Sequence, residues 1–193
     1  MDDTAYLAIL NRELGPKRVA HCQRVAETAV ALANKNHANE RSAYIAGLMH
    51  DYAKKFDSRR LLEIASEADL VTDPCELKVP SLLHGAVGAY LLKKENIVQD
   101  EAALQAMARH TVGCAHMSLL DKVIYVADYI EPGRTTPGVE SVRKAAFKDL
   151  DQGVWLSLTH SLTWLLGEKQ IIHPQSIQMY NWLLSEVVTA PRA

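Results

Sequence analysis

Cysteine is scarce in this sequence, and the few cysteines present form no pairing pattern. Cys22, Cys75 and Cys114 are odd in number, and no two of them are spaced as a CxxC pair. Neither a disulfide framework nor a thiolate zinc site is therefore expected. Unpaired thiols of this kind are typical of a reducing compartment, which favours a cytoplasmic protein.

Signals for secretion or membrane insertion are also lacking. The first residues, Met1 to Thr4, have neither the basic start nor the apolar core of a signal peptide. No apolar run approaches the roughly 20 residues that a membrane-spanning helix needs. We therefore expect a cytoplasmic location and no membrane partner.

No excess of charge of either sign is present. The 21 Lys and Arg residues nearly balance the 23 Asp and Glu residues, which leaves a formal net charge of −2. Nucleic-acid binding usually leaves a basic footprint, so no nucleic-acid partner is expected. An anionic small molecule would have to be bound by a few individual Lys or Arg side chains in its site. With 193 residues, 48% of them hydrophobic, the chain can bury a sizeable core.

Alternating β-strand patterns are absent, and helical periodicity dominates. The 9 glycines and 7 prolines fall mostly between the periodic segments. This pattern predicts one all-α domain spanning residues 1–193, with loops at 74–80, 131–138 and 171–174. The predicted helices cover about residues 3–13, 16–36, 39–51, 58–68, 81–95, 100–109, 118–130, 139–147, 150–166 and 175–187.

Two histidines and two aspartates lie where a core is expected. His21 falls on the apolar face of the second predicted helix, and His50-Asp51 ends a helix that is apolar almost all round. Asp128 lies at the edge of an apolar stripe. Each residue alone has an ordinary explanation, such as a hydrogen-bonded core histidine or a carboxylate paired with a lysine. The combination is harder to dismiss, because a carboxylate facing a core is costly unless it is paired or bound to a metal.

Imidazole and carboxylate donors together suit divalent iron, manganese and zinc ions. Two donors of each kind leave positions free on an octahedral ion, where water becomes nucleophilic near neutral pH and a phosphoryl oxygen is polarised. No thiolate ligand is present to suggest a purely structural zinc site. The residues themselves therefore predict a metal-activated water and an anionic substrate.

The order His21, His50-Asp51, Asp128 also forms an H…HD…D signature, and other segments extend the likeness. These are 48–54 (Leu-Met-His-Asp-Tyr-Ala-Lys), 84–85 (His-Gly), 109–113 (Arg-His-Thr-Val-Gly), 127–134 (Ala-Asp-Tyr-Ile-Glu-Pro-Gly-Arg), 172–174 (Ile-His-Pro) and 180–181 (Tyr-Asn). Over roughly residues 15–185 the chain resembles the HD-domain phosphohydrolases. Among these it is similar to the YqeK-type symmetrical diadenosine tetraphosphate hydrolases.

The resemblance implies an HD-domain helical bundle with its motif-bearing core at about 16–135. The C-terminal helices would complete the nucleotide site. It further implies cleavage of diadenosine tetraphosphate at its centre into two ADP, with iron as the expected metal and Mn²⁺ or another divalent ion as the alternative.

A role for each site residue follows from the same resemblance. The implied metal ligands are His21, His50, Asp51 and Asp128, and the implied catalytic residues are these four with His84 and His110. The residues expected to contact the nucleotide are Arg18, His21, Lys54, His84, His110, Thr111, Asp128, Arg134, Ile171, Ile172 and His173. For His84 and His110 the sequence leaves open a phosphate contact, protonation of the leaving ADP, or a second metal; we favour substrate contact.

Two other functions remain open on the sequence. The first is an HD-type nucleotidase that releases phosphate from nucleoside or deoxynucleoside monophosphates. The second is a regulatory module that senses a metal and a nucleotide without turnover. We also expect a homodimer, because helical domains of this kind often expose an apolar helix face.

Overall fold

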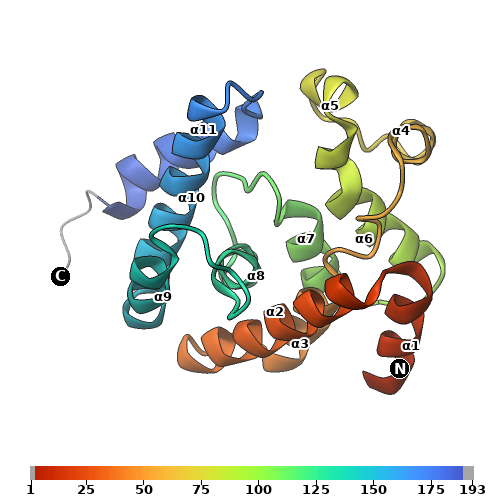
Figure 1. Ribbon diagram of the computed structural model, residues 1–193, viewed down its shortest axis with the longest axis horizontal. Coiled ribbons are helices and arrows are strands. Elements are labelled where there is room, and N and C mark those ends of the chain that lie inside the picture. The colour runs from red at the N-terminus through yellow and green to blue at the C-terminus, as the bar shows by residue number, and fades with distance from the viewer. Residues whose placement is uncertain (1–2, 189–193) are drawn as a thin grey trace.

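The computed structural model describes residues 3–188, and within that range every regular element is a helix (Figure 1). This confirms the all-α fold class. The elements in chain order are α1 (Asp3–Glu13), α2 (Pro16–Lys35), α3 (Glu40–Met49), α4 (Ser58–Glu67), α5 (Cys75–Lys78), the 3-10 turn η1 (Pro80–Leu83), α6 (His84–Lys94), α7 (Glu101–Arg109), α8 (Leu119–Ile130), α9 (Val139–Lys148), α10 (Leu150–Gly167), α11 (Pro174–Trp182) and the π-type turn η2 (Leu183–Val188).

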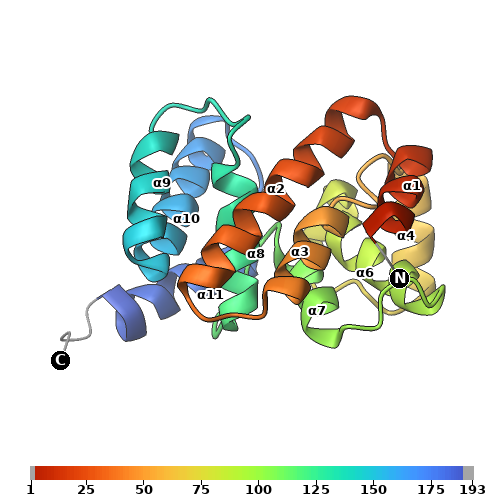
Figure 2. The same cartoon turned by 90° about the horizontal axis from the view of Figure 1, so that it is seen from below.

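Helices α2, α3, α7 and α8 form the centre of the molecule, because each packs against at least two of the others. Helix α2 contributes a fully buried stripe that includes Val25, Ala29 and Leu32. Figure 2 shows α9 and α10 on one side of α8, and α1, α4 and α6 on the far side of α3. The burial of apolar faces against neighbouring helices stabilises this arrangement more than helix propensity does.

Two glycines set the close approaches on which the site depends. A methyl group at Gly47 would lie 2.8 Å from the backbone of Ala26, so α3 can meet α2 only where a side chain is missing. A methyl group at Gly85 would lie 2.7 Å from the carbonyl oxygen of Met107, which brings α6 equally close to α7. These contacts place the C-terminal end of α3 beside α2, and the start of α6 beside the end of α7.

Side chains cap the N-terminal ends of α3, α4, α7 and α8. Asn39 and Asp100 accept hydrogen bonds from the first turns of α3 and α7, and Ser118 forms a reciprocal capping box with Asp121 on α8. At α4 the capping residue is Asp57, whose side chain accepts from the backbone N–H of Arg60, a common role for aspartate.

Three predicted boundaries were inaccurate. The loop predicted at 74–80 contains the short helix α5, which Pro74 precedes. The helix predicted at 81–95 is divided at His84, where a tight 3-10 turn becomes α6. The last helix begins at Pro174, a residue suited to the first helical turn, and widens to a π-type turn from Leu183.

The loop between α8 and α9 is held in place by one arginine. Arg143 of α9 donates to the carbonyl oxygens of Ile130, Glu131 and Arg134 at 2.7, 2.7 and 2.8 Å. Three bonds from one guanidinium fix a loop that has no regular structure of its own. Within residues 3–188, no helix has both the length and the apolar character that crossing a membrane requires.

Candidate metal centre

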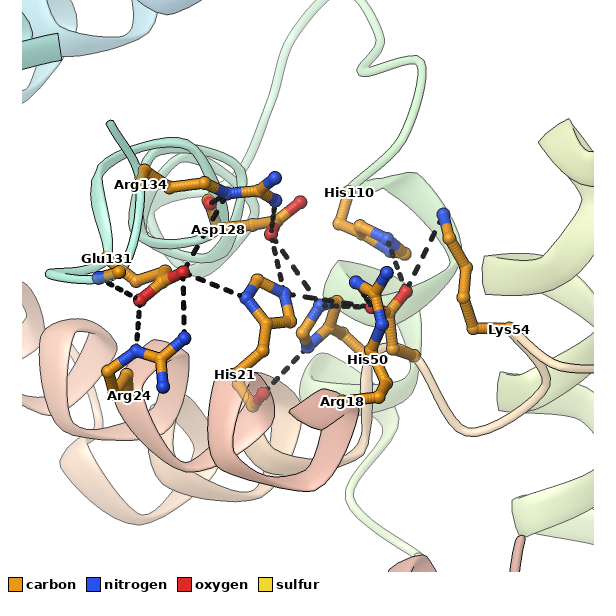
Figure 3. Close-up of polar contacts among 12 residues, drawn as sticks. Arg18, His21, Arg24, His50, Lys54, His110, Asp128, Glu131 and Arg134 are labelled. Atoms are coloured by element: carbon orange, nitrogen blue, oxygen red, sulfur yellow. Dashed lines mark hydrogen bonds and ion pairs between the residues drawn. The ribbon is translucent and has the colours of Figure 1, made fainter. Parts of the chain in front are cut away.

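The four predicted metal ligands come together in the folded chain, and Figure 3 labels three of them, His21, His50 and Asp128. His21 lies on α2, His50 and Asp51 follow α3, and Asp128 lies near the end of α8. Nε2 of His21 is 3.1 Å from Oδ1 of Asp128 and 3.7 Å from Oδ2 of Asp51. Nε2 of His50 is 3.4 Å from Oδ2 of Asp51 and 3.8 Å from Oδ1 of Asp128. The two imidazoles and two carboxylates therefore face one another across a single small volume.

Three histidines are oriented by the ends of the helices that precede them. His50, His84 and His110 each follow the last turn of a helix, and each donates from Nδ1 to the carbonyl oxygen three residues earlier, at 2.8, 2.6 and 2.7 Å. A carbonyl oxygen can only accept, so each Nδ1 carries a proton, and Nε2 is the ring nitrogen that can bind a metal. All three Nε2 atoms approach a carboxylate oxygen of Asp51, within 3.1 to 3.8 Å.

His21 is oriented by a buried carboxylate. Its Nδ1 lies 3.1 Å from Oε1 of Glu131, which also receives hydrogen bonds from Arg24 and from the backbone N–H of Gly133. Burial alone would raise the pKa of Glu131, but the Arg24 guanidinium, the Gly133 N–H and His21 outweigh it and lower the pKa to about 2. Glu131 is therefore ionised at neutral pH and holds the proton of His21 on Nδ1, so that Nε2 faces the two aspartates.

The sequence reasoning assigned no role to Glu131 or Arg24. A signal for both was available in the spacing. Glu131 lies three residues after Asp128, and Arg24 three residues after His21, which places each on the same side of its helix as the ligand. The contact between Glu131 and Arg24 joins α2 to the end of α8, and such a long-range pairing cannot be read from either segment alone.

Nε2 of His21 and Nε2 of His50 are buried and have no hydrogen-bond partner within the described residues. A buried polar atom without a partner costs about 1–3 kcal/mol, so two of them beside two carboxylates require an explanation. Three groups of side chains can each direct donor atoms to within 4.8 Å of one another: His21, His50 and Asp51; His50, His110 and Asp128; and Asp51, His84 and His110. The residues present therefore fit a divalent metal.

The carboxylates of the centre are ionised. Burial would raise the pKa of Asp51 and of Asp128, but His50, other histidines and, for Asp128, Arg134 outweigh this effect and hold both pKa values well below the usual range. Burial and the neighbouring His50 and His84 lower the pKa of His110 to about 3. Neutral imidazoles and ionised carboxylates are the forms in which these side chains bind metal.

Three of the predicted substrate contacts are cations around this centre. Arg18 donates to Oδ2 of Asp51 at 2.8 Å, and Arg134 donates to Oδ1 of Asp128 at 2.6 Å. Nζ of Lys54 lies 3.8 Å from Oδ1 of Asp51 and 3.3 Å from Nε2 of His84. All three side chains are about one third exposed, so each can also contact an anion that enters from solvent.

A cavity of about 190 Å³ opens beside these groups. Predicted contacts Lys54, His110, Thr111, Asp128 and Arg134 line it. Oγ1 of Thr111 lies 3.2 Å from Nε2 of His110. The cavity is also lined by four residues that the sequence reasoning did not select, Tyr125, Tyr129, Thr136 and Ser161. Tyr129 is next to Asp128 in the sequence, whereas Ser161 comes from α10 and could be found only from the folded chain.

The predicted contacts Ile171, Ile172 and His173 lie elsewhere in the described residues and line neither this cavity nor the larger one described below. His173 is buried, caps α11 through Nδ1, and approaches Oε1 of Glu76 with Nε2 at 3.2 Å. Glu76 is only 6% exposed. Its carboxylate also accepts from the backbone N–H groups of Thr72 and Asp73, which offsets its burial.

Comparison with known proteins agrees with this geometry. Residues 18–133 match the HD domain family. A Bacillus subtilis protein named "Bis(5'-nucleosyl)-tetraphosphatase, symmetrical" is 40% identical over 93% of this chain and 96% of its own. A Staphylococcus aureus protein of the same name is 32% identical over 90% of each chain. The crystal structure of an HD superfamily hydrolase from Clostridium acetobutylicum, 37% identical, superimposes with a TM-score of 0.92 over 96% of this chain and 98% of that one. The chain therefore belongs to the HD domain family and, within it, to the group of the symmetrical bis(5'-nucleosyl)-tetraphosphatases.

Proposed function

We propose that this chain is a cytoplasmic enzyme that hydrolyses diadenosine tetraphosphate symmetrically to two ADP, with iron as its native divalent ion. The observation that carries the proposal is the pair of buried Nε2 atoms, of His21 and His50, which lack hydrogen-bond partners among the described residues and face two ionised carboxylates. The names of its relatives supply the substrate.

His21, His50, Asp51 and Asp128 would hold the metal in the proposed enzyme. A divalent ion bound there supplies Lewis acidity, which makes water nucleophilic near neutral pH and polarises a phosphoryl oxygen. The protein's own contribution is to orient these donors. The carbonyl oxygen of Gly47 fixes the ring of His50, and Glu131 fixes the ring of His21.

The cations would bind and orient the tetraphosphate. Arg18 and Arg134 now bond the carboxylates of Asp51 and Asp128. A metal that draws on the same oxygens would leave guanidinium donors available for phosphate. Phosphoryl transfer depends mainly on positioning and on neutralising charge, and Lys54 adds a third positive charge on the same side of the centre.

His84 and His110 are proposed as contacts to the phosphates. Thr111 lies within hydrogen-bond distance of both rings and would take part in the same contact. The low pKa of His110 leaves that ring neutral at pH 7, which disfavours it as the acid that protonates the leaving ADP. The donor group of Asp51, His84 and His110 keeps a second metal as the alternative, and the number of ions bound per chain distinguishes the two.

We further propose that residues 1–193 form one domain, in which the motif-bearing core at about 16–135 is completed by the C-terminal helices. Ser161 of α10 supports this, because it lines the 190 Å³ cavity together with core residues such as His110. The roles of Ile171, Ile172 and His173 stay predictions, as does a homodimer.

The test compares metals and substrates on protein purified without oxygen. The apoprotein would be loaded with Fe²⁺, Mn²⁺ or Zn²⁺ and incubated with diadenosine tetraphosphate, and the nucleotides would be separated by ion exchange. The expected result is turnover to ADP that is highest with Fe²⁺ and lost on chelation. A His37→Asn variant is the matched control, because His37 is an exposed histidine with positive φ, a conformation that asparagine tolerates.

The same assay separates the two remaining candidates. Release of inorganic phosphate from nucleoside or deoxynucleoside monophosphates, without cleavage of the tetraphosphate, would support a nucleotidase. Tight binding of metal and nucleotide without turnover of any substrate would support a sensing module. Either outcome would overturn the proposed hydrolase.

A further inference from the structure

A second and larger cavity is also lined by Arg134. Its volume is about 540 Å³, within the range of roughly 300–1,000 Å³ that is typical of small-molecule sites. It lies between the N-terminal end of α2 and the loop after α8. His21 and Arg134 line it, so it reaches the metal centre directly. Arg134 also lines the smaller cavity, so the two spaces share this side chain.

The rim of this cavity is positively charged. Lys17, Arg18, Lys55 and Arg134 all line it, and its single carboxylate is that of Glu131. Glu131 is engaged by Arg24 and His21 and is almost fully buried. Within the described residues, the ammonium groups of Lys17 and Lys55 take part in no ion pair, and both side chains are exposed. The net charge facing this space is therefore positive, although the chain as a whole is slightly acidic.

Two glycines keep the cavity open. Gly15 and Gly133 both line it and contribute no side chain. A methyl group at Gly133 would lie 2.4 Å from Nη2 of Arg24, and one at Gly15 would lie 3.2 Å from Nζ of Lys55. The absence of a side chain at Gly133 lets Arg24 reach Glu131, and its absence at Gly15 lets Lys55 fold over the cavity wall.

Symmetrical cleavage requires a second nucleotide site, and the larger cavity could provide it. A substrate cut between its two central phosphates must place one nucleoside diphosphate on each side of the metal centre. Five of the eleven residues predicted to contact nucleotide line the smaller cavity. Of that set, only Arg18, His21 and Arg134 line the larger cavity. Lys17 and Lys55 line the larger cavity alone, so they have no role in binding the nucleoside diphosphate that occupies the smaller one.

The geometry points to the 540 Å³ cavity as the site of the second nucleoside diphosphate arm, with Lys17 and Lys55 as its phosphate contacts. This inference rests on the proposed function, because only a substrate with two such arms would fill both cavities. The two lysines are binding residues, and they touch neither the metal ligands nor the central phosphates.

The experiment is a titration of the metal-loaded protein with ADP, together with steady-state kinetics on diadenosine tetraphosphate. Wild type should bind two ADP per chain. The Lys17→Ala/Lys55→Ala variant should lose the weaker site and raise KM on the order of tenfold, because each exposed charge contributes up to about 1 kcal/mol. The difference should shrink as ionic strength rises. Lys35→Ala, which removes an exposed lysine at the opposite end of α2, should behave as wild type.

A charge-reversed variant, Lys17→Glu/Lys55→Glu, is included in case the alanine variant changes KM too little to measure. It should raise KM further, while its far-ultraviolet circular dichroism should match that of wild type. Binding of one ADP per chain in wild type, with KM unaltered in both variants, would overturn the inference and leave the hydrolase intact. Failure of wild type to cleave the substrate would instead count against the proposed function, and the ADP titration would still test whether the second cavity binds a nucleotide.

Discussion

Replacement of Glu131 by glutamine tests the idea that a buried carboxylate prepares His21 for metal binding. Four hydrogen-bond donors converge on Glu131, from His21, from Arg24 twice, and from the N–H of Gly133. A carboxylate can accept all of them with its two oxygens. A glutamine offers one oxygen and one NH₂ group, so its NH₂ must face at least one of these donors.

The expected magnitude follows from that conflict. If the amide oxygen faces Arg24 and Gly133, His21 loses the acceptor that fixes its proton on Nδ1. The ring is then no longer held with Nε2 as its metal-binding nitrogen. Loss of such a supporting partner typically weakens metal affinity by about 10- to 100-fold, equivalent to roughly 1.4–2.7 kcal/mol. Glu131→Ala should weaken it at least as much and should also lower stability, because it leaves the buried side of Arg24 unpaired.

The assay is competition of the protein with a chromophoric chelator for Mn²⁺ and Co²⁺, which reports metal affinity without relying on turnover. The visible spectrum of bound Co²⁺ adds a direct view of the ligand geometry. Glu67→Gln is the control, since Glu67 is an exposed carboxylate on α4. Unchanged affinity and an unchanged Co²⁺ spectrum in a folded Glu131→Gln protein would refute the reasoning.

Three further predictions concern the centre and its supports. His50→Ala and Asp51→Ala should lose bound metal and activity together, as measured by elemental analysis beside the assay; full metal occupancy in both would contradict the ligand assignment. Arg134→Ala should keep its metal while nucleotide affinity falls on the order of tenfold or more by calorimetry, since a charged hydrogen bond is worth about 1.5–3 kcal/mol; unchanged affinity would remove Arg134 from the substrate site. Gly47→Ala should destabilise the protein by about 1–3 kcal/mol in urea, because a methyl group there would lie 2.8 Å from the α2 backbone. Gly167→Ala, which meets nothing within 4 Å, is its control, and equal stability of the two variants would argue against the close packing of α2 and α3.

The sequence predicted most of what depends on local pattern. Periodicity and helix-ending residues located the long helices α2, α8 and α10 to within about two residues. The positions of His21, His50-Asp51 and Asp128 at expected core faces, together with the family resemblance, selected four residues that the fold brings together. Their function as metal ligands stays a prediction.

Features that depend on long-range contacts were missed. Glu131 and Arg24 gain their role only when α2 meets the loop after α8. The burial of Glu76 also depends on such contacts, because the turn at 72–75 and His173 enclose it. The second cavity could not be predicted, because it is formed by the start of α2, the turn that follows α3 and the loop after α8, which are distant in the chain.

The most direct test of the central claim is product analysis in water enriched with heavy oxygen. Protein loaded with ferrous iron under anaerobic conditions would be given diadenosine tetraphosphate, and the products would be resolved by ion exchange and mass spectrometry. The account predicts ADP as the sole nucleotide product, with one heavy oxygen incorporated for every two ADP formed, and no reaction after chelation. A mixture of AMP and ATP, or ADP formation that persists without metal, would contradict it.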